Sequence, residues 1–414
     1  MELIAAALFA LALVHTFAAK QFERLSHRYP RHAGLFHLLG EVEVVFGFWA
    51  IVLVLVMALV LGGDQALQYA ESRQYTEPLF VFVVMVVAAS RPILQMVMDI
   101  VDWSARHAPV RAPLARAWLG MAAVPLFGSA ITEPAAMTIA ALLLAPQVFR
   151  AGIPERTKYL ALGVLFVNVS IGGTLTAFAA PPVLMVAATW HWDSAFMLAN
   201  FGWKAAIAVV INATVAVFAM RDHLVDNLNQ PSHPKVARVP NSLVLVHLAF
   251  LAGVVALAHH PVAFLGLFLM FLGVVQAYAR YQSPPILKEA LLVGFFLAGL
   301  VVLGGMQQWW LQPIVSSLPP KALFLAATAL TALTDNAALT YLGSLIEGIS
   351  DAAKYSLVAG AVAGGGLSVI ANAPNPAGVA LLRHGFADAS IGAAELLVGA
   401  LFPTLVAIAA FTLL

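Results

Sequence analysis

The sequence contains no cysteine among its 414 residues, which excludes disulfides, thiolate metal sites and cysteine nucleophiles. Charge is scarce too, because Asp, Glu, Lys and Arg make up only 10% of the chain, against about 25% in soluble domains. The 21 basic and 20 acidic residues give a net charge of +1, so we expect no nucleic-acid partner. With 62% hydrophobic residues and a mean hydropathy of +0.92, the chain is predicted to be a polytopic membrane protein without a separate soluble domain.

Several catalytic signatures are also missing. The sequence has no HExxH zinc motif, P-loop, GxSxG nucleophile elbow or nucleotide fingerprint. A pump ATPase and an intramembrane hydrolase are therefore not supported, and we expect neither an enzyme nor a bound cofactor.

Long apolar stretches occupy almost the whole chain. About 20 apolar residues cross about 30 Å of hydrocarbon, so an all-α fold with ten or more spans is expected. Residues 1–19 are predicted to be a retained span rather than a signal peptide, because Glu2 stands where a positive n-region would be and the cations follow the stretch. The other apolar stretches are residues 39–63, 77–101, 117–149, 157–189, 196–220, 241–258, 261–278, 287–306, 319–348, 354–382 and 391–414.

Two stretches, 117–149 and 319–348, are too long for one crossing and contain Pro or acidic residues, so we interpret them as re-entrant hairpins. If every other stretch crosses once, sixteen Lys and Arg residues lie on one side of the membrane and only Arg73, Lys321 and Lys354 on the other. The positive-inside rule makes the first side cytoplasmic and places both termini outside, in a bacterial inner membrane.

The polar segment 222–240 is predicted to be a cytoplasmic linker between two membrane halves, residues 1–221 and 241–414. The halves share a pattern, because TEPAAMT at 132–138 matches TDNAALT at 334–340. This match places an acidic residue inside each predicted hairpin.

A second match follows each hairpin. GGTLTAFAAPP at 172–182 resembles GGGLSVIANAP at 364–374. The common order, an acidic hairpin and then a Gly-rich break ending in Pro, predicts two inverted repeats, with the hairpin near 117–149 opening inward and the one near 319–348 opening outward.

Glu133 and Asp335 are the most informative residues of these repeats. A carboxylate at bilayer depth costs roughly 2.5–3.5 kcal/mol, so it normally faces a cavity or a partner and marks an ion or proton path. The alternative, polar side chains that only hold helices together, suits an isolated Asn or Thr better than two equivalent acids. Lys204 is a further candidate, as a countercharge to an acidic tip. Oxygen ligands suited to a hard cation are supplied nearby by Thr132, Thr334, Asn336 and Thr340, and the breaks add Asn168, Thr176, Ser368, Asn372 and Asn375.

At the motifs TEPAAMT, IGGTLTAFAAPPVLM, LTDNAALT and ANAPNPAG the chain resembles the ion transporter superfamily of elevator carriers. Within it, the chain is similar over essentially its whole length to the bacterial family named putative sodium/proton antiporter. The resemblance implies two inverted repeats, each with a re-entrant hairpin and a broken helix, in a transport domain that slides against a scaffold. It also implies a homodimer.

Carried over to this sequence, the resemblance implies the following sites. Ions and protons would bind at Glu133, Asp335, Asn336, Thr132, Thr334, Thr138 and Thr340. Substrate would bind at Gly172, Gly173, Thr174, Pro181, Gly365, Ser368, Asn372 and Asn375, with sodium on Asp335, Asn336 and Asn372. We add Asn168 and Thr176 to the substrate site from their position at the first break alone.

The chain departs from the carboxylate carriers of this fold, which have Ser-Asn-Thr at the tips where this chain has acids. It also has Pro181-Pro182-Val183 in place of Pro-Pro-Asn, which removes one sodium ligand. A carboxylate would repel an anionic substrate, so the acidic tips favour a cation.

These features predict a secondary active transporter in the lipid bilayer that exchanges a monovalent cation, sodium, for protons. The alternative within transport is a sodium- or proton-coupled symporter of a small organic solute or anion; a channel and a scaffold without transport are the other classes. Asp335 has more oxygen ligands beside it than Glu133, which Pro134 follows. From the sequence we therefore expect Asp335→Asn to abolish exchange and Glu133→Gln only to weaken it.

Overall fold

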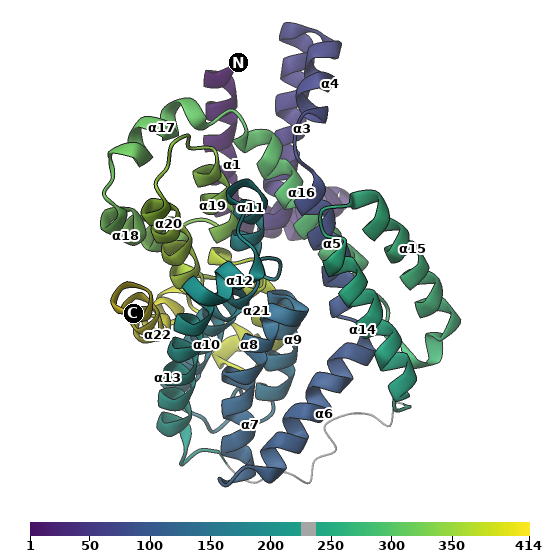
Figure 1. Cartoon of the computed structure of the whole chain (residues 1–414), viewed down its shortest axis with the longest axis vertical. Coiled ribbons are helices and arrows are strands. Elements are labelled where there is room, and N and C mark those ends of the chain that lie inside the picture. The colour runs from purple at the N-terminus through teal and green to yellow at the C-terminus, as the bar shows by residue number, and fades with distance from the viewer. Residues whose placement is uncertain (225–236) are drawn as a thin grey trace.

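A computed structural model describes residues 1–224 and 237–414, so most of the predicted linker 222–240 lies outside the described residues. The described residues form 22 α-helices joined by loops and single turns, with no strand among them (Figure 1). Helices suit a bilayer because they satisfy their backbone groups internally. The short turns are η1 (Pro30–His32), η2 (Gly173–Leu175), η3 (Leu198–Gly202), η4 (Ala279–Tyr281), η5 (Val369–Ala371), η6 (Arg383–Gly385) and η7 (Ala387–Ala389).

Six helical segments of the described chain are long and apolar enough to cross a membrane, and the number is up to eight if each of two bent pairs is one span. The six contain α1 (Glu2–Arg28), α3 (Val42–Leu61), α10 (Glu155–Gly172), α12 (Ser194–Met197) with α13 (Trp203–Met220), α16 (Leu287–Gly304) and α22 (Ala393–Leu413). Shorter apolar helices are α9 (Glu133–Leu144), α11 (Pro181–Trp190), α14 (Asn241–Ala256), α15 (Pro261–Ala277) and α18 (Pro320–Thr331). The protein is therefore an all-α integral membrane protein.

The stretch 77–101, predicted as a single crossing, is instead a bent pair. Helix α5 (Thr76–Ala88) meets α6 (Arg91–His107) at 61°. Ser90 is extended, with φ −66° and ψ 143°, and Pro92 follows in the first turn of α6. Proline lacks an amide hydrogen and clashes with the preceding turn, so one continuous helix cannot form through this point.

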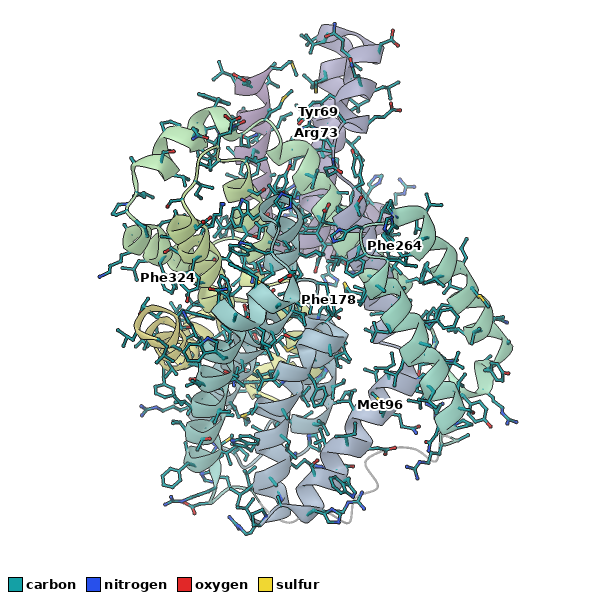
Figure 2. The ribbon with its side chains drawn as sticks, viewed as in Figure 1. Tyr69, Arg73, Met96, Phe178, Phe264 and Phe324 are labelled. Carbon is teal, nitrogen blue, oxygen red and sulfur yellow. The ribbon has the colours of Figure 1, made fainter. Side chains whose placement is uncertain are left out.

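One group of helices consists of α1, α3, α5, α14, α15 and α16, with the short α2 (Ala33–Gly40) and α4 (Gly63–Glu71) beside them. Helices α3 and α16 cross closely, because Gly47 and Gly299 face each other there without side chains. Helix α15 packs on α5 through an edge-to-face pair of Phe264 and Phe80, whose ring centroids are 5.9 Å apart. Figure 2 labels Phe264.

Tyr69 connects α4 to α16 of this group through a hydrogen bond. Its hydroxyl donates to the Val302 carbonyl at 2.6 Å, and the Arg73 guanidinium lies 4.5 Å from its ring centroid (Figure 2). Burial raises the pKa of Tyr69 to about 12, although Arg73 opposes the shift. The hydroxyl therefore keeps its proton, and this hydrogen bond, at any physiological pH.

The second group contains the two stretches that the sequence predicts to be hairpins, and each is interrupted. In the first, α7 (Ala112–Met121) and α8 (Ala123–Ile131) meet at 40°, and the chain turns back at Thr132 into α9. In the second, α18 turns back through residues 332–335 into α19 (Asn336–Ser344), after α17 (Gln308–Ser317). Neither stretch is an uninterrupted crossing helix.

Each hairpin is followed by a broken helix in the same group. Helix α10 ends at Gly172, and α11 begins at Pro181 after the turn η2. Likewise, α20 (Asp351–Gly364) ends before the turn η5, and α21 (Asn375–Leu382) follows. Gly163 of α10 lies against the α22 backbone at Gly399, which allows these helices to approach closely.

Candidate functional site

Glu133, the first residue of α9, lies at the centre of the second helix group and is fully buried. Its Oε2 accepts a hydrogen bond of 2.9 Å from Nδ2 of Asn372, which belongs to the second break. Its Oε1 has no partner. Gly173 of the first break leaves room for the carboxyl group, since a Cβ there would lie 2.6 Å from Oε1. The first tip thus contacts both breaks.

Thr132 has a rare backbone conformation at this tip, with φ 81° and ψ 151°. Positive φ is costly for a β-branched residue, about 1–3 kcal/mol, and such strain tends to occur at functional sites. The hydroxyl of Thr132 is buried without a hydrogen-bond partner. It is therefore a second oxygen with free acceptor capacity beside Glu133.

Ser129 joins the first tip to the first break, and sequence reasoning missed it. Its hydroxyl donates to the Gly172 carbonyl at 2.7 Å and accepts from the Leu175 amide at 2.9 Å. Its own carbonyl accepts from the Thr176 hydroxyl at 2.7 Å. These bonds satisfy backbone groups that the break frees. The one feature of the sequence that could have predicted this role is the position of Ser129, one helical turn before Thr132.

The second tip is built differently, because Asp335 is the N-cap of α19. Its Oδ1 accepts from the amides of Ala337 at 2.8 Å and Ala338 at 3.3 Å. Its neighbour Asn336 is fully buried and donates to Ser170 of α10 at 3.4 Å. The second tip therefore contacts the end of α10, just before the first break.

The second break is held by Asn375, whose amide donates to the carbonyls of Gly365 at 2.8 Å and Ser368 at 3.0 Å. Gly365 packs against Ser170, so a side chain there would displace the contact with the second tip. The two tips and the two breaks thus form one continuous buried region.

Unpartnered side-chain oxygens concentrate in this region. In the described part of the chain, six of the nine buried side-chain polar atoms without a partner lie here. Carboxyl, amide and hydroxyl oxygens are hard ligands that suit a hard cation. The six are on Thr132, Glu133, Asn336, Ser368, Asn372 and Asn375. No group of three or more His, Cys, Asp or Glu residues that could hold a metal ion occurs among residues 1–224 and 237–414.

Other predicted site residues have polar side chains that are engaged elsewhere. Asn168 donates to the carbonyls of Met121 at 2.8 Å and Val209 at 3.2 Å, and accepts from Asn212 at 2.9 Å. It therefore ties α10 to the bend between α7 and α8, and to α13. Thr138, Thr174 and Thr340 each donate to a carbonyl three or four residues earlier.

The remaining predicted residues border the region. Gly172 approaches the Pro125 carbonyl, where a Cβ would lie 2.6 Å from the oxygen. Pro181 begins α11, and Thr334 is half-buried beside Asp335.

Lys204 is not a countercharge to either acidic tip. Its ammonium group donates to the Tyr355 hydroxyl at 2.9 Å and lies 4.7 Å from the centroid of that ring. Tyr355 in turn donates to the Phe411 carbonyl at 2.8 Å, so this chain of bonds joins α13, α20 and α22. The sequence-based prediction considered only carboxylates as partners of Lys204 and did not consider the hydroxyl of a tyrosine.

Comparison with known proteins adds the following. A family model described as "Putative Na+/H+ antiporter" matches residues 1–414. Among solved structures, the chain is similar to a crystal structure of the Alcanivorax borkumensis YdaH transporter, described as having an unusual topology, with 13% identity and a TM-score of 0.45. That match covers 90% of this chain and 96% of the other. No curated protein matches the sequence.

Proposed function

The chain belongs to the family described as "Putative Na+/H+ antiporter", and from this membership we propose that it exchanges sodium ions for protons across the bilayer. The observation that carries the proposal is Glu133, a fully buried acid with one free oxygen among other free oxygens. Burying a carboxyl group inside a membrane protein is costly, so such a group normally marks an ion or proton path.

Competition for one carboxyl group explains the exchange. When Glu133 is ionised, its free Oε1 and nearby neutral oxygens can surround a sodium ion. When it carries a proton, its charge is lost and sodium leaves. Sodium and the proton therefore exclude each other at Glu133. An empty site with an ionised, buried carboxylate is unfavourable, so each passage of one ion is coupled to the return of the other.

Asn372 supports the same scheme from the second break. Its amide nitrogen donates to Glu133, which fixes the side chain so that its free Oδ1 remains available as a ligand. The buried oxygen of Asn336 is a further candidate ligand. Asp335 supplies a second carboxyl group, whose Oδ1 caps α19. We assign sodium to these residues together with Glu133.

The two helix groups suit a sliding mechanism. Hairpins and broken helices lie in one group, and few polar bonds cross to the other; one is the Tyr341 hydroxyl of α19, which donates to the Val301 carbonyl of α16 at 3.0 Å. We propose that the group with the hairpins moves as an elevator against the other, as two inverted repeats in residues 1–221 and 241–414. A homodimer through the first group, which would be the stationary scaffold, is part of this proposal.

Sodium/proton exchange can be tested with purified protein in liposomes. With the lumen more acidic than the medium, protons leaving the liposome should drive sodium uptake above that of protein-free liposomes. Collapse of the pH gradient with an ionophore should stop it. Absence of such uptake, together with sodium-dependent uptake of an organic solute, would instead support the symporter.

Orientation in a bacterial inner membrane can be tested directly, because the chain has no cysteine to replace. Exposed Gln65 of α4 and exposed Val110 between α6 and α7 lie at opposite ends of the molecule (Figure 1). From the basic loops we propose that Val110 faces the cytoplasm. In intact spheroplasts, an impermeant maleimide should label Gln65→Cys, and should label Val110→Cys only after permeabilisation. The reverse pattern would invert the proposed topology.

A further inference from the structure

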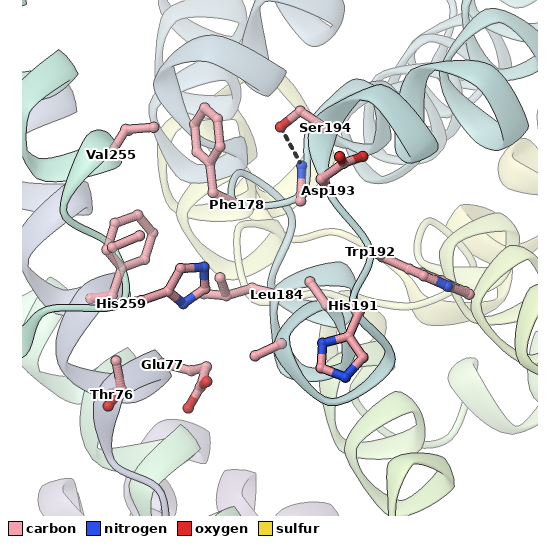
Figure 3. A pocket seen from close by; sticks show the side chains of 15 residues that line it. Thr76, Glu77, Phe178, Leu184, His191, Trp192, Asp193, Ser194, Val255 and His259 are labelled. Carbon is pink, nitrogen blue, oxygen red and sulfur yellow. Dashed lines mark hydrogen bonds between the residues drawn. The ribbon is translucent and has the colours of Figure 1, made fainter.

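A cavity of about 580 Å³ lies between the two helix groups, apart from the buried site. Fifteen residues line it, from α5, the end of α14 with the loop after it, and the segment from the first break through α11 to α12 (Figure 3). Its volume falls in the range of pockets that hold small organic molecules, about 300–1,000 Å³, and far exceeds what one sodium ion needs.

The residues that can be charged in this lining favour negative charge. Glu77 and Asp193 are acidic, and none of the fifteen lining residues is Lys or Arg. His191 and His259 also line the cavity, and neither has the permanent positive charge of Lys or Arg. The cavity therefore complements a positive charge.

Aromatic side chains form much of the rest of the wall. Phe80, Phe178 and Trp192 all line the cavity. Aromatic faces attract organic cations through their quadrupole and also bury apolar groups. The lining thus suits a ligand that combines a positive charge with an apolar body.

Glu77 is the acidic residue of the cavity whose carboxyl group is best placed to meet a cation. It forms no salt bridge in the described part of the chain, and Figure 3 shows its carboxyl group on the same wall as Thr76 and His259. Asp193, on the opposite wall, is partly engaged because its Oδ1 caps α12 by accepting from the Phe196 amide at 2.7 Å. Glu77 is accordingly the anchor for a cation.

The two walls belong to different helix groups. Glu77 and Phe80 come from α5, whereas Phe178 lies in the first break and Leu184 in α11. A ligand that contacts both walls would resist any movement of one group against the other.

We propose that this cavity binds a compact monovalent organic cation with an apolar or aromatic body, anchored by Glu77, and that the bound cation stops transport. The binding site stands on the cavity alone, whereas the inhibition rests on the proposed exchange and on relative movement of the two helix groups.

Binding can be measured by isothermal titration calorimetry on the purified full-length protein at pH 8 and low salt, with benzyltrimethylammonium as the probe and uncharged benzyl alcohol as its control. Glu77→Gln should weaken binding of the cation by about tenfold or more. Phe178→Ala should also weaken it. The matched control Glu71→Gln removes an exposed carboxylate of α4, outside the cavity lining, and should bind as the wild type does.

Equal affinity in Glu77→Gln and the wild type, or equal affinity for benzyl alcohol, would overturn the site. In the liposome assay, benzyltrimethylammonium should inhibit the wild type and leave Glu77→Gln largely uninhibited. Binding without inhibition of measurable exchange would overturn the inhibitory role. A wild type that binds the probe but shows no exchange at all would contradict the proposed function and leave the binding site standing.

Discussion

Replacing Glu133 with glutamine is expected to reduce sodium/proton exchange in liposomes to the level of protein-free liposomes. Glutamine has nearly the same shape, and its carbonyl oxygen can still accept the bond from Asn372. The fold should therefore persist, whereas the only group of this tip that can carry a proton or a negative charge is lost. Sodium uptake driven by an acidic lumen measures the effect, and thermal unfolding in detergent confirms that the variant is folded.

Asp335→Asn is the informative comparison, and it should retain partial exchange. Asparagine caps helices about as well as aspartate, so the bonds to the amides of Ala337 and Ala338 survive. This order reverses the one that the sequence suggested, because Asp335 already uses one oxygen as a cap whereas Glu133 is buried with an oxygen free. Weakened but measurable exchange by Glu133→Gln, with Asp335→Asn inactive and equally folded, would restore the order expected from the sequence.

Much of this architecture follows from composition and local pattern. Apolar length predicts the helices. Pro and Gly predict the first tip and the two broken helices, because these residues act on their own backbone, whereas the second tip was predicted from its acidic residue, Asp335. The bend at Ser90 escaped prediction, although Pro92 is visible, since a proline in an apolar stretch is compatible with either a kink or a complete break.

The contacts within the site were less predictable. Glu133 and Asn372 are 239 positions apart in the sequence, and no local pattern states that their side chains form a hydrogen bond. The same holds for Asn336 with Ser170, 166 positions apart. Such pairs depend on how the helices pack, which also decides that Lys204 meets Tyr355 rather than a carboxylate.

The hydrogen bond between Glu133 and Asn372 offers a test of whether the position of the charge or only its presence supports exchange. Asn372→Asp alone places a second carboxyl group 2.9 Å from the first in a fully buried setting. Two carboxylates at such a distance cannot both be ionised without a large cost, so one of them retains a proton. We expect this variant to fold and to lose proton-coupled sodium uptake.

Combining Glu133→Gln with Asn372→Asp should recover measurable exchange, although each single change abolishes it. Both replacements keep the shape of the side chain, so the pair still holds one amide and one carboxyl group, now exchanged across the same hydrogen bond. The new glutamine amide can donate to the new carboxylate, and the site regains a single ionisable group among the same free oxygens. Sodium uptake and thermal unfolding of the double variant are compared with those of each single variant.

Asn336→Asp is the matched control, because it adds a carboxyl group at another fully buried amide that bonds to Ser170 instead. Recovery when Glu133→Gln is combined with Asn372→Asp, but not when it is combined with Asn336→Asp, would place the transported charge at the junction of the first tip and the second break. If the double variant Glu133→Gln with Asn372→Asp folds but shows no exchange, the carboxyl group works only on α9.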